Sequence, residues 1–346
     1  GETLSYEVPT PAAHPSGAYG AHPHFHTTVD QQVYGGMAGL ILIDGGWLDQ
    51  PGIAEATEKV MVLKEVIIDD DALTDESPGV TTNELWTINS QVNPQVSAAP
   101  GERQLWRIAN LGNDTFFNIS LEGHSFTVVA TDGVPVTAPF EADSWALPPA
   151  GRVEVLVEAS TAGSYKLRNI PVDEGFETFE ERTLATLVVE GDQAGELPPV
   201  PSVLEGAPPD LAQGEPDVKR TLVFSNDSLV TADGEVESVG NWEICGLAFD
   251  AGRTDISARL GELEEWTLVN NDTEDHPFHI HQNDFQVVSI NGVTQPFQGH
   301  RDTVTIPRGG QIQVRQRFED FTGRWVFHCH ILFHEDHGMM GVIEVT

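Results

Sequence analysis

The stretch that decides the fold lies near the end of the chain and reads His328-Cys329-His330-Ile331-Leu332-Phe333-His334-Glu335-Asp336-His337-Gly338-Met339. Cys329, His334 and Met339 supply a thiolate, an imidazole and a thioether from one loop. Redox-active copper takes a trigonal set of one Cys and two His, with a long axial Met. The alternative is a lone buried cysteine in a histidine-rich surface loop, which leaves the agreement of residue types and spacing unexplained. The stretch therefore predicts a copper site.

The histidines that flank the cysteine predict a second metal site. Side chains alternate across an extended strand, so His328 and His330 point away from Cys329. Neutral imidazoles are common ligands for copper. We therefore expect these two histidines to hold a further metal, a few bonds away from the first.

Most of the other histidines are clustered as well. The clusters are His22, His24 and His26; His276, His279 and His281; and His328, His330, His334 and His337. His279 and His281, two apart on a strand, face one side, whereas His276 is offset toward another metal. The alternative for each cluster is a polar loop with incidental histidines. The histidines without a clustered partner we interpret as ordinary hydrogen-bonded side chains: His14, His124 and His300.

The remaining sequence predicts an all-β protein. Short apolar or alternating runs are broken by Gly, Pro, Asn and Asp, and no long stretch carries a helical period. The predicted strands include Met61–Ile68, Leu105–Ala109, Phe126–Ala130, Val153–Glu158, Leu184–Glu190, Thr221–Phe224, Phe285–Ile290 and Ile312–Phe318. Sandwich or barrel domains are the natural class for such a pattern.

An internal repeat organises these strands into domains. Residues recur at offsets of 160 and 159: Gly101, Glu102, Trp106 and Asn110 as Gly261, Glu262, Trp266 and Asn270, and Phe126, Val128 and Gly133 as Phe285, Val287 and Gly292. We place a first repeat at 51–195, a Pro-rich linker at 196–216 and a second repeat at 217–346. Residues 116–120 of the first repeat correspond to the 276–281 stretch of the second repeat but contain no histidine. We therefore expect the first repeat to be metal-free. Residues 1–50 resemble the end of a third copy.

The charge balance excludes several kinds of partner. Lys+Arg 17 against Asp+Glu 54 gives a net charge of −37, which argues against nucleic acid or an anionic membrane surface. No apolar run approaches membrane-spanning length. We expect a secreted or cell-envelope (periplasm-equivalent) protein. If Cys329 is a ligand, Cys245 has no partner and no intrachain disulfide is expected.

The scattered acids also predict a halophilic source, since high salt screens charge repulsion. The alternative is an acidic secreted protein from an ordinary environment. The halophile hypothesis expects thermal stability to rise between low and molar salt, and an unchanged or falling melting temperature would contradict it.

Three motifs carry a resemblance to the multicopper oxidases, the family of laccases, bilirubin oxidases and copper-efflux oxidases. They are His22-Pro23-His24, the 276–281 cluster and the 328–339 loop, in the family's order. The resemblance covers the whole chain. It implies tandem cupredoxin (Greek-key β-sandwich) domains in a three-domain architecture, with an incomplete first domain at 1–50. It also implies copper as cofactor and reduction of dioxygen to water.

The resemblance assigns the ligands residue by residue. Type 1 copper takes His276, Cys329, His334 and Met339. The trinuclear cluster takes His279 at type 2 copper and His281, His328, His330, His22 and His24 at the type 3 pair. The pair His24 and His26 is an alternative to His22 and His24. The family's first His-X-His motif is absent, so we expect a missing N-terminal segment or a second chain to complete the cluster; the alternative is a cluster that does not work.

The resemblance further implies that a donor gives electrons at type 1 copper near His334, which we expect close to the surface. Electrons would pass through Cys329, and Glu335 would relay protons. The alternative for Glu335 is a cap-like or solvated acid. We interpret Asp272, Glu274 and Asp275 as ordinary solvated acids; the alternative is that they favour cationic donors or accept a phenol proton. Asp302 looks like a fold-supporting residue.

We therefore expect a laccase-like enzyme that oxidises phenols, aromatic amines or metal ions. The chain has only four methionines, which favours an organic donor over Cu(I). One alternative within the enzyme class is a cuprous oxidase for copper detoxification. A second alternative is a blue-copper electron-transfer or copper-binding protein with an incomplete trinuclear cluster. A metal-free shell is the third.

Overall fold

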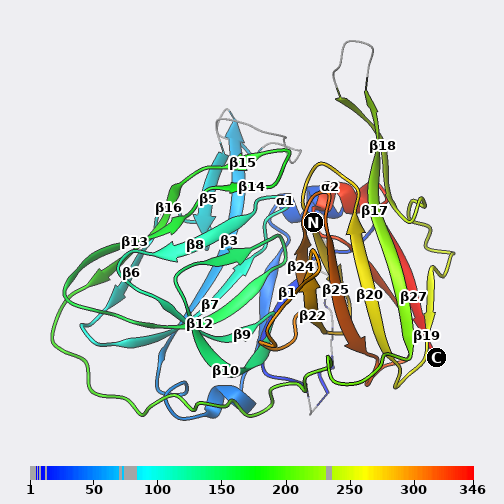
Figure 1. Ribbon diagram of the computed structural model, residues 1–346. Helices are drawn as coiled ribbons and strands as arrows, with labels where there is room; N and C mark the ends of the chain where they lie inside the picture. Colours follow the sequence, from blue (N-terminus) through cyan, green and yellow to red (C-terminus); the bar gives the residue numbers. More distant parts are fainter. Residues whose placement is uncertain are drawn as a thin grey trace.

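The structure is a computed structural model that describes residues 5, 7, 9–11, 14–69, 72–73, 84–230 and 236–346 (Figure 1). Nearly all of its regular structure is β, so the predicted all-β class is confirmed. The predicted strands all fall within observed ones, except that Glu190 and Phe318 lie one residue beyond them. Within these described residues, no helix combines the length and the apolar character needed to cross a membrane.

The first repeat consists of facing β-sheets, drawn in cyan and green in Figure 1. One sheet has the order β10 (Val134–Ala142), β9 (Phe126–Thr131), β12 (Arg152–Glu158), β7 (Arg103–Asn110), β3 (Thr57–Asp69) and β4 (Ala72–Leu73), with β5 (Glu84–Ile88) also paired to β3. The other has the order β11 (Trp145–Leu147), β8 (Phe117–Leu121), β13 (Gly163–Asn169), β16 (Arg182–Val189) and β6 (Gln95–Ala98). A small ribbon, β14 (Val172–Asp173) and β15 (Thr178–Phe179), extends toward the second repeat.

The second repeat has the same arrangement of sheets. One sheet has the order β18 (Val236–Ile244), β17 (Val218–Val230), β20 (Leu263–Asn270), β25 (Gln311–Arg317), β22 (Phe285–Ile290) and β23 (Val293–Thr294). The other has the order β19 (Ile256–Ala258), β27 (Met340–Val345), β26 (Gly323–Cys329), β21 (His276–Ile280) and β24 (Thr303–Ile306). This second sheet carries the predicted ligands of the 276–281 and 328–339 stretches.

Alternating side chains place the cores between the sheets. In β25 every second residue is buried, including Ile312 and Val314, while Gln311 is exposed. Trp266 on β20 is fully buried opposite them. Such period-two burial is the pattern of a strand with one face in a core. Tight hairpin turns with positive φ connect β9 to β10 and β22 to β23. These turns explain why Gly133 recurs as Gly292 in the second repeat.

The N-terminal segment packs across both repeats. Its strands β1 (Gly17–Ala21) and β2 (Gly39–Ile43) pair with each other, and the main-chain N of Ala18 donates to Glu154 of the first repeat. A 3₁₀ turn, η1 (Gly46–Asp49), leads into β3. The short helix α1 (Val29–Tyr34) lies against α2 (Leu332–Asp336) of the second repeat (Figure 1). The segment that contains His22 and His24 is thereby brought to the 328–339 loop.

Candidate metal centre

One candidate centre joins side chains from three elements of the second repeat. His276 begins β21, Cys329 ends β26 and His334 lies in α2, and all three are buried. Sγ of Cys329 is 3.6 Å from Nδ1 of His276 and 3.6 Å from Nδ1 of His334. Met339 is fully buried, and its main-chain N donates to the carbonyl oxygen of His334. The structure thus brings Cys329, His276 and His334 together, and a main-chain hydrogen bond ties Met339 to His334.

A carboxylate lies behind each of these two imidazoles. Nε2 of His276 is 3.3 Å from Oδ2 of Asp272, and Nε2 of His334 is 3.7 Å from Oε1 of Glu274. Each ring therefore turns Nδ1 toward the thiol and Nε2 toward an acid. Metal-bound histidines commonly have such carboxylate partners, which fix the ring and its tautomer. The prediction that Asp272 and Glu274 are ordinary solvated acids is wrong, because both are buried.

Burial also changes the ionisation of this centre. It raises the pKa of the Cys329 thiol well above its usual value, and it raises the pKa of Glu274 to about 8. Asp275 is half-buried and accepts from the main-chain N of Arg308. A buried thiol becomes a thiolate when a metal cation takes the place of its proton. One thiolate, two imidazoles and a buried thioether are a donor set that fits copper.

An aromatic ring covers the histidine where we expected a donor to arrive. Trp242 on β18 stacks on His334, with ring centroids 3.5 Å apart and an interplanar angle of 15°. His334 is only 5% exposed, whereas the neighbouring Phe333 is exposed. Gly338 allows the loop to approach this cover, because a Cβ there would lie 2.8 Å from the carbonyl oxygen of Trp242. The expected surface position of His334 is therefore only partly correct.

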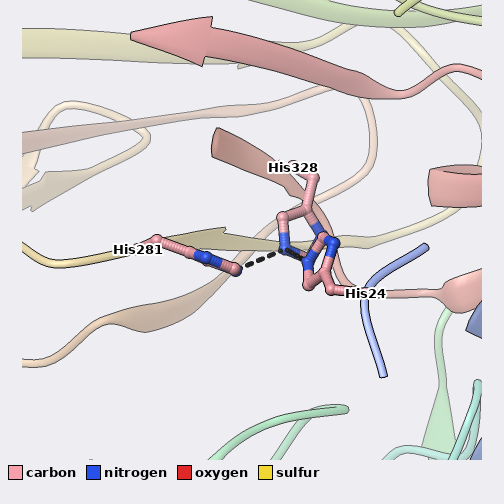
Figure 2. Close-up of side chains that lie close together, drawn as sticks. All are labelled: His24, His281 and His328. Atoms are coloured by element: carbon pink, nitrogen blue, oxygen red, sulfur yellow. Dashed lines mark hydrogen bonds between the residues drawn. The ribbon is translucent and has the colours of Figure 1, made fainter. Parts of the chain in front are cut away.

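A second candidate centre gathers imidazoles from the N-terminal segment, β21 and β26. Figure 2 shows His24, His281 and His328 directed toward one another. Nε2 of His328 is 3.3 Å from Nε2 of His24 and 3.3 Å from Nε2 of His281. Nδ1 of His328 is 3.0 Å from the carbonyl oxygen of Cys329, which places its proton on that nitrogen. The Nε2 lone pairs are then available for a metal.

Further histidines adjoin this group. The ring centroid of His330 is 5.3 Å from that of His22 and 5.5 Å from that of His279. Nδ1 of His22 donates to the carbonyl oxygen of Pro23. Nδ1 of His279 lies 3.1 Å from the carbonyl oxygen of Asp302. The structure thus brings together His22, His24, His279, His281, His328 and His330.

Burial keeps these imidazoles in the form that binds a metal. Burial, reinforced by the neighbouring histidines, lowers the pKa of His24 to about 4 and that of His328 to about 3. It lowers the pKa of His281 and of His330 well below the usual value for the same reasons. A metal needs the neutral ring as its ligand. These neutral, converging imidazoles fit copper ions.

Glu335 lies directly behind this second centre. Its Oε1 is 3.5 Å from Nδ1 of His24, and its Oε2 is 3.0 Å from Nδ1 of His328. The side chain is fully buried inside α2, so the alternative of a solvated or cap-like acid is wrong. Burial raises the pKa of Glu335 to about 7. A carboxyl group with such a pKa holds or releases a proton near neutral pH, and its relay role stays a prediction.

The other histidines lie apart from both centres. His26 packs against Phe249, with ring centroids 4.7 Å apart, so the structure places His22 rather than His26 beside His24. His337 stacks on Phe333 at the surface. The remaining three have carbonyl partners, as expected of ordinary hydrogen-bonded side chains: His14 with Pro15, His124 with Glu122 and His300 with Pro209. Cys245 is exposed and Cys329 is buried.

Two functional features had no signal that spacing could reveal. Asp336 accepts from the main-chain N of Thr27 at 2.7 Å and of Asp30 at 2.9 Å, and so fixes the histidine-bearing N-terminal segment to α2. Trp242 covers His334 from a strand far away in the sequence. The only available hint was the position of Asp336 next to Glu335 in the ligand loop.

Comparisons with known proteins agree with this site. The sequence pattern of the family described as multicopper oxidase matches residues 56–192 and again residues 223–346. A multicopper oxidase of Staphylococcus aureus is 26% identical over all of this chain and 71% of its own length. A laccase of Haloferax volcanii is 26% identical, covering 92% of this chain and 58% of its own length.

The fold agrees as well. The solved structure of a multicopper oxidase from Campylobacter jejuni, described as a metallo-oxidase, matches with a TM-score of 0.82 at 29% identity, covering 95% of this chain and 72% of that one. The predicted cupredoxin-type fold is confirmed by this match. The chain therefore belongs to the multicopper oxidase family of oxidoreductase enzymes, which use oxygen and hold copper ions as type 1 and trinuclear centres.

Proposed function

We propose that this chain is a laccase-like oxidase that removes electrons one at a time from phenols or aromatic amines. The observation that carries this proposal is the cover of His334, where Trp242 stacks on the ring and Glu274 faces Nε2. Beside this buried cover, the exposed ring of Phe333 presents an aromatic surface, with its centroid 6.4 Å from that of His334. An aromatic donor packs well on such a surface, and above about pH 8, where Glu274 is ionised, its carboxylate accepts the proton that a phenol loses with its electron.

The methionines support an organic donor. Met61, Met339 and Met340 are buried, and Met37 is exposed on the N-terminal segment. Thioethers are the soft ligands that capture Cu(I). The part of the chain that the structure describes thus gathers no methionine cluster at the surface near His334. This distribution favours phenols and aromatic amines over cuprous ions.

A metal-ion donor is the second candidate within the enzyme class. Asp272 and Glu274 form a buried acidic pair beside the two imidazoles of the first centre. Carboxylates attract cations, and the similar Campylobacter jejuni protein is described as a metallo-oxidase. A role in copper detoxification as a cuprous oxidase belongs to this second candidate.

The residues of this chain divide the work between the two centres. Copper bound at both supplies one-electron acceptance and the four-electron reduction of dioxygen to water. Cys329 lies between His328 and His330 in the sequence, so main-chain bonds connect the centres directly. Oε2 of Glu335 lies 3.0 Å from Nδ1 of His328, and Glu335 is our proposed proton donor for oxygen reduction.

We also propose that histidines from outside these 346 residues complete the second centre, on a further segment or a second chain. The support is the ligand count, since the described histidines supply fewer ligands than the resemblance implies. The alternative is a blue-copper electron-transfer or copper-binding protein. We propose a secreted or cell-envelope location and no nucleic-acid or membrane partner, in line with the net charge of −37.

One experiment separates these functions. Copper-loaded protein is examined by EPR with double integration, and oxygen uptake is measured with a methoxyphenol, with Fe(II) and with Cu(I). Type 1 and type 2 signals with phenol-driven uptake support the laccase-like proposal. Uptake with the metal ions alone supports the metallo-oxidase. A type 1 signal without any uptake contradicts both and leaves the electron-transfer protein.

The variant Glu274→Gln refines the donor assignment, with Glu344→Gln on β27 as the matched control away from the centre. At a pH above about 8, where Glu274 is ionised, we expect kcat/KM for the phenol to fall by about tenfold or more in the first variant, because the proton acceptor is lost. The control is expected to keep the wild-type value. Equal kinetics in both variants would contradict the acceptor role.

A further inference from the structure

A buried arginine of the first repeat reaches into the second repeat behind His279. Arg152 begins β12 and is 4% exposed. Its guanidinium donates to both oxygens of Asp302, from Nη1 to Oδ1 at 2.8 Å and from Nη2 to Oδ2 at 2.6 Å. A planar two-pronged pair of this kind fixes the orientation of the carboxylate.

Asp302 in turn orients the hydroxyl group of the next residue, Thr303. Oγ1 of Thr303 donates to Oδ1 of Asp302 at 2.8 Å and lies 3.0 Å from Nδ1 of His279. Because the hydroxyl proton points at Asp302, the oxygen lone pair faces the imidazole. The carbonyl oxygen of Asp302 is a second acceptor, 3.1 Å from the same nitrogen. Nδ1 of His279 is therefore the protonated nitrogen, and Nε2 keeps its lone pair.

A second aspartate, Asp132, contacts both Arg152 and Thr303, the two ends of this series of hydrogen bonds. Asp132, in the turn after β9, accepts from the main-chain N of Arg152 at 2.8 Å and from the main-chain N of Thr303 at 3.1 Å. Its carbonyl oxygen also accepts from Nη2 of Arg152 at 2.8 Å. The guanidinium of Arg152 and the hydroxyl of Thr303 thus hold the carboxylate of Asp302 in a fixed place.

The equivalent turn of the second repeat shows which part of this arrangement the fold itself requires. There Asn291 accepts from the main-chain N of Gln311, just as Asp132 accepts from that of Arg152. Gln311 is exposed, and its main-chain bond is a local one. The bonds from Arg152 to Asp302 cross between the repeats and are additional to the turn.

We propose that Arg152 is a positioning residue for the second metal centre, acting through Asp302 and Thr303 to hold His279 in the ring orientation and tautomer that a metal requires. The inference rests on His279 as a copper ligand and is independent of the electron donor. Partners of this kind behind a ligating histidine typically change metal affinity by about 10–100-fold when they are removed. The competing view is that Arg152 only braces the two repeats against each other.

The first test uses metal-free protein labelled with ¹⁵N-histidine. Long-range ¹H–¹⁵N NMR at mildly alkaline pH reports the tautomer of His279, assigned by its loss in His279→Gln. We expect a protected Nδ1–H signal in the wild type and in Thr303→Ser. We expect Arg152→Gln and Thr303→Val to lose the protection, with Arg152→Lys intermediate because it keeps the charge without the fork.

The second test uses copper-loaded protein. Arg152→Gln and Thr303→Val are expected to release the type 2 copper to a chelator about 10–100 times more readily and to change its EPR hyperfine coupling. The visible absorption of the Cys329 centre should stay the same. The matched control is Asp173→Asn, which breaks the exposed inter-repeat pair between Arg308 and Asp173 and should match the wild type in every readout.

Two results would overturn the proposal. One is an Arg152→Gln protein with a lowered melting temperature but an unchanged His279 signal and unchanged type 2 EPR, which would show a brace alone. The other is an equal effect of Asp173→Asn. If Arg152→Gln does not fold, Thr303→Val decides the question, because it leaves the pair of Arg152 and Asp302 intact.

Discussion

The two repeats place different side chains at equivalent positions of the same sheet. In the first repeat Phe117 pairs with Leu147 and Asn169 pairs with Ile119; in the second, His276 pairs with Ile306 and Cys329 with Phe278. Phe117, Ser120 and Asn169 therefore occupy the places of His276, His279 and Cys329. The scaffold around these positions is shared, and a few substitutions separate a structural domain from a copper-binding one.

The shared scaffold can be seen in one buried residue of each repeat. Nδ2 of Asn110 donates to the carbonyl oxygens of Thr115 and Leu147. Nδ2 of Asn270 donates to the carbonyl oxygens of the equivalent residues, Glu274 and Ile306. The loop before the first strand of the ligand sheet is thus held in the same way with or without a metal. The metal centre does not create this geometry but uses it.

The largest expected effect comes from removing the side chain that most distinguishes the repeats. Cys329→Ser should abolish the intense visible absorption and the turnover, because the thiolate is lost. The type 2 EPR signal and the far-UV spectrum should remain, since the scaffold does not depend on this sulfur. Visible spectroscopy and oxygen uptake measure the outcome. If the variant keeps the blue colour, Cys329 is not a ligand of type 1 copper.

The next effect concerns the buried acid of the second repeat. Glu335→Gln should slow oxygen uptake by roughly 10²–10⁴-fold, the usual contribution of a general acid, while the visible absorption remains. Stopped-flow reoxidation of reduced protein isolates the oxygen step. Asp336→Asn, which changes the neighbouring acid, should instead loosen the N-terminal segment. Unchanged reoxidation in Glu335→Gln would remove the relay role.

The counterpart of Cys329 should affect stability rather than copper. The amide of Asn169 donates to the carbonyl oxygens of Phe179 and Glu180 and accepts from the main-chain N of Asn118. Asn169→Ala leaves these buried groups unpaired and should cost about 2–4 kcal/mol of unfolding free energy. Denaturant unfolding measures this cost, and copper content per chain serves as the control. A loss of copper instead would show that the repeats are less independent than the comparison implies.

The smallest effect concerns Glu154, the buried acid of the first repeat. Burial raises the pKa of Glu154 to about 7, although Arg107 and Arg152 lie close. A carboxyl group with a raised folded pKa favours the folded state at low pH, so its contribution is lost as pH rises from about 4.5 to about 7. We expect wild-type stability to fall by on the order of 2 kcal/mol more than that of Glu154→Gln between pH 5 and pH 8. Equal pH profiles would contradict this, and turnover should be unaffected.

The sequence predicted the parts of the site that depend on local spacing. Cys329, His334 and Met339 lie in one loop, and alternation along a strand correctly separated His328 from Cys329. Asp272 and Glu274 were predicted wrongly as solvated acids, because in so acidic a chain nothing local distinguishes a buried carboxylate from a solvated one. Trp242 and Arg152 could not be predicted, because their contacts depend on how the strands and repeats pack. Long-range packing, rather than residue type, assigns these functions.

The second centre has a consequence for the order of synthesis and assembly. His24 and His328 lie 304 positions apart in the sequence. Asp336, the last residue of α2, fixes the segment that carries His24. Contacts with such long sequence separation form late, after the local hairpins of each repeat. A ribosome therefore synthesises the first repeat and most of the second before these imidazoles can meet. We therefore expect copper to be loaded at this centre only after both repeats have folded.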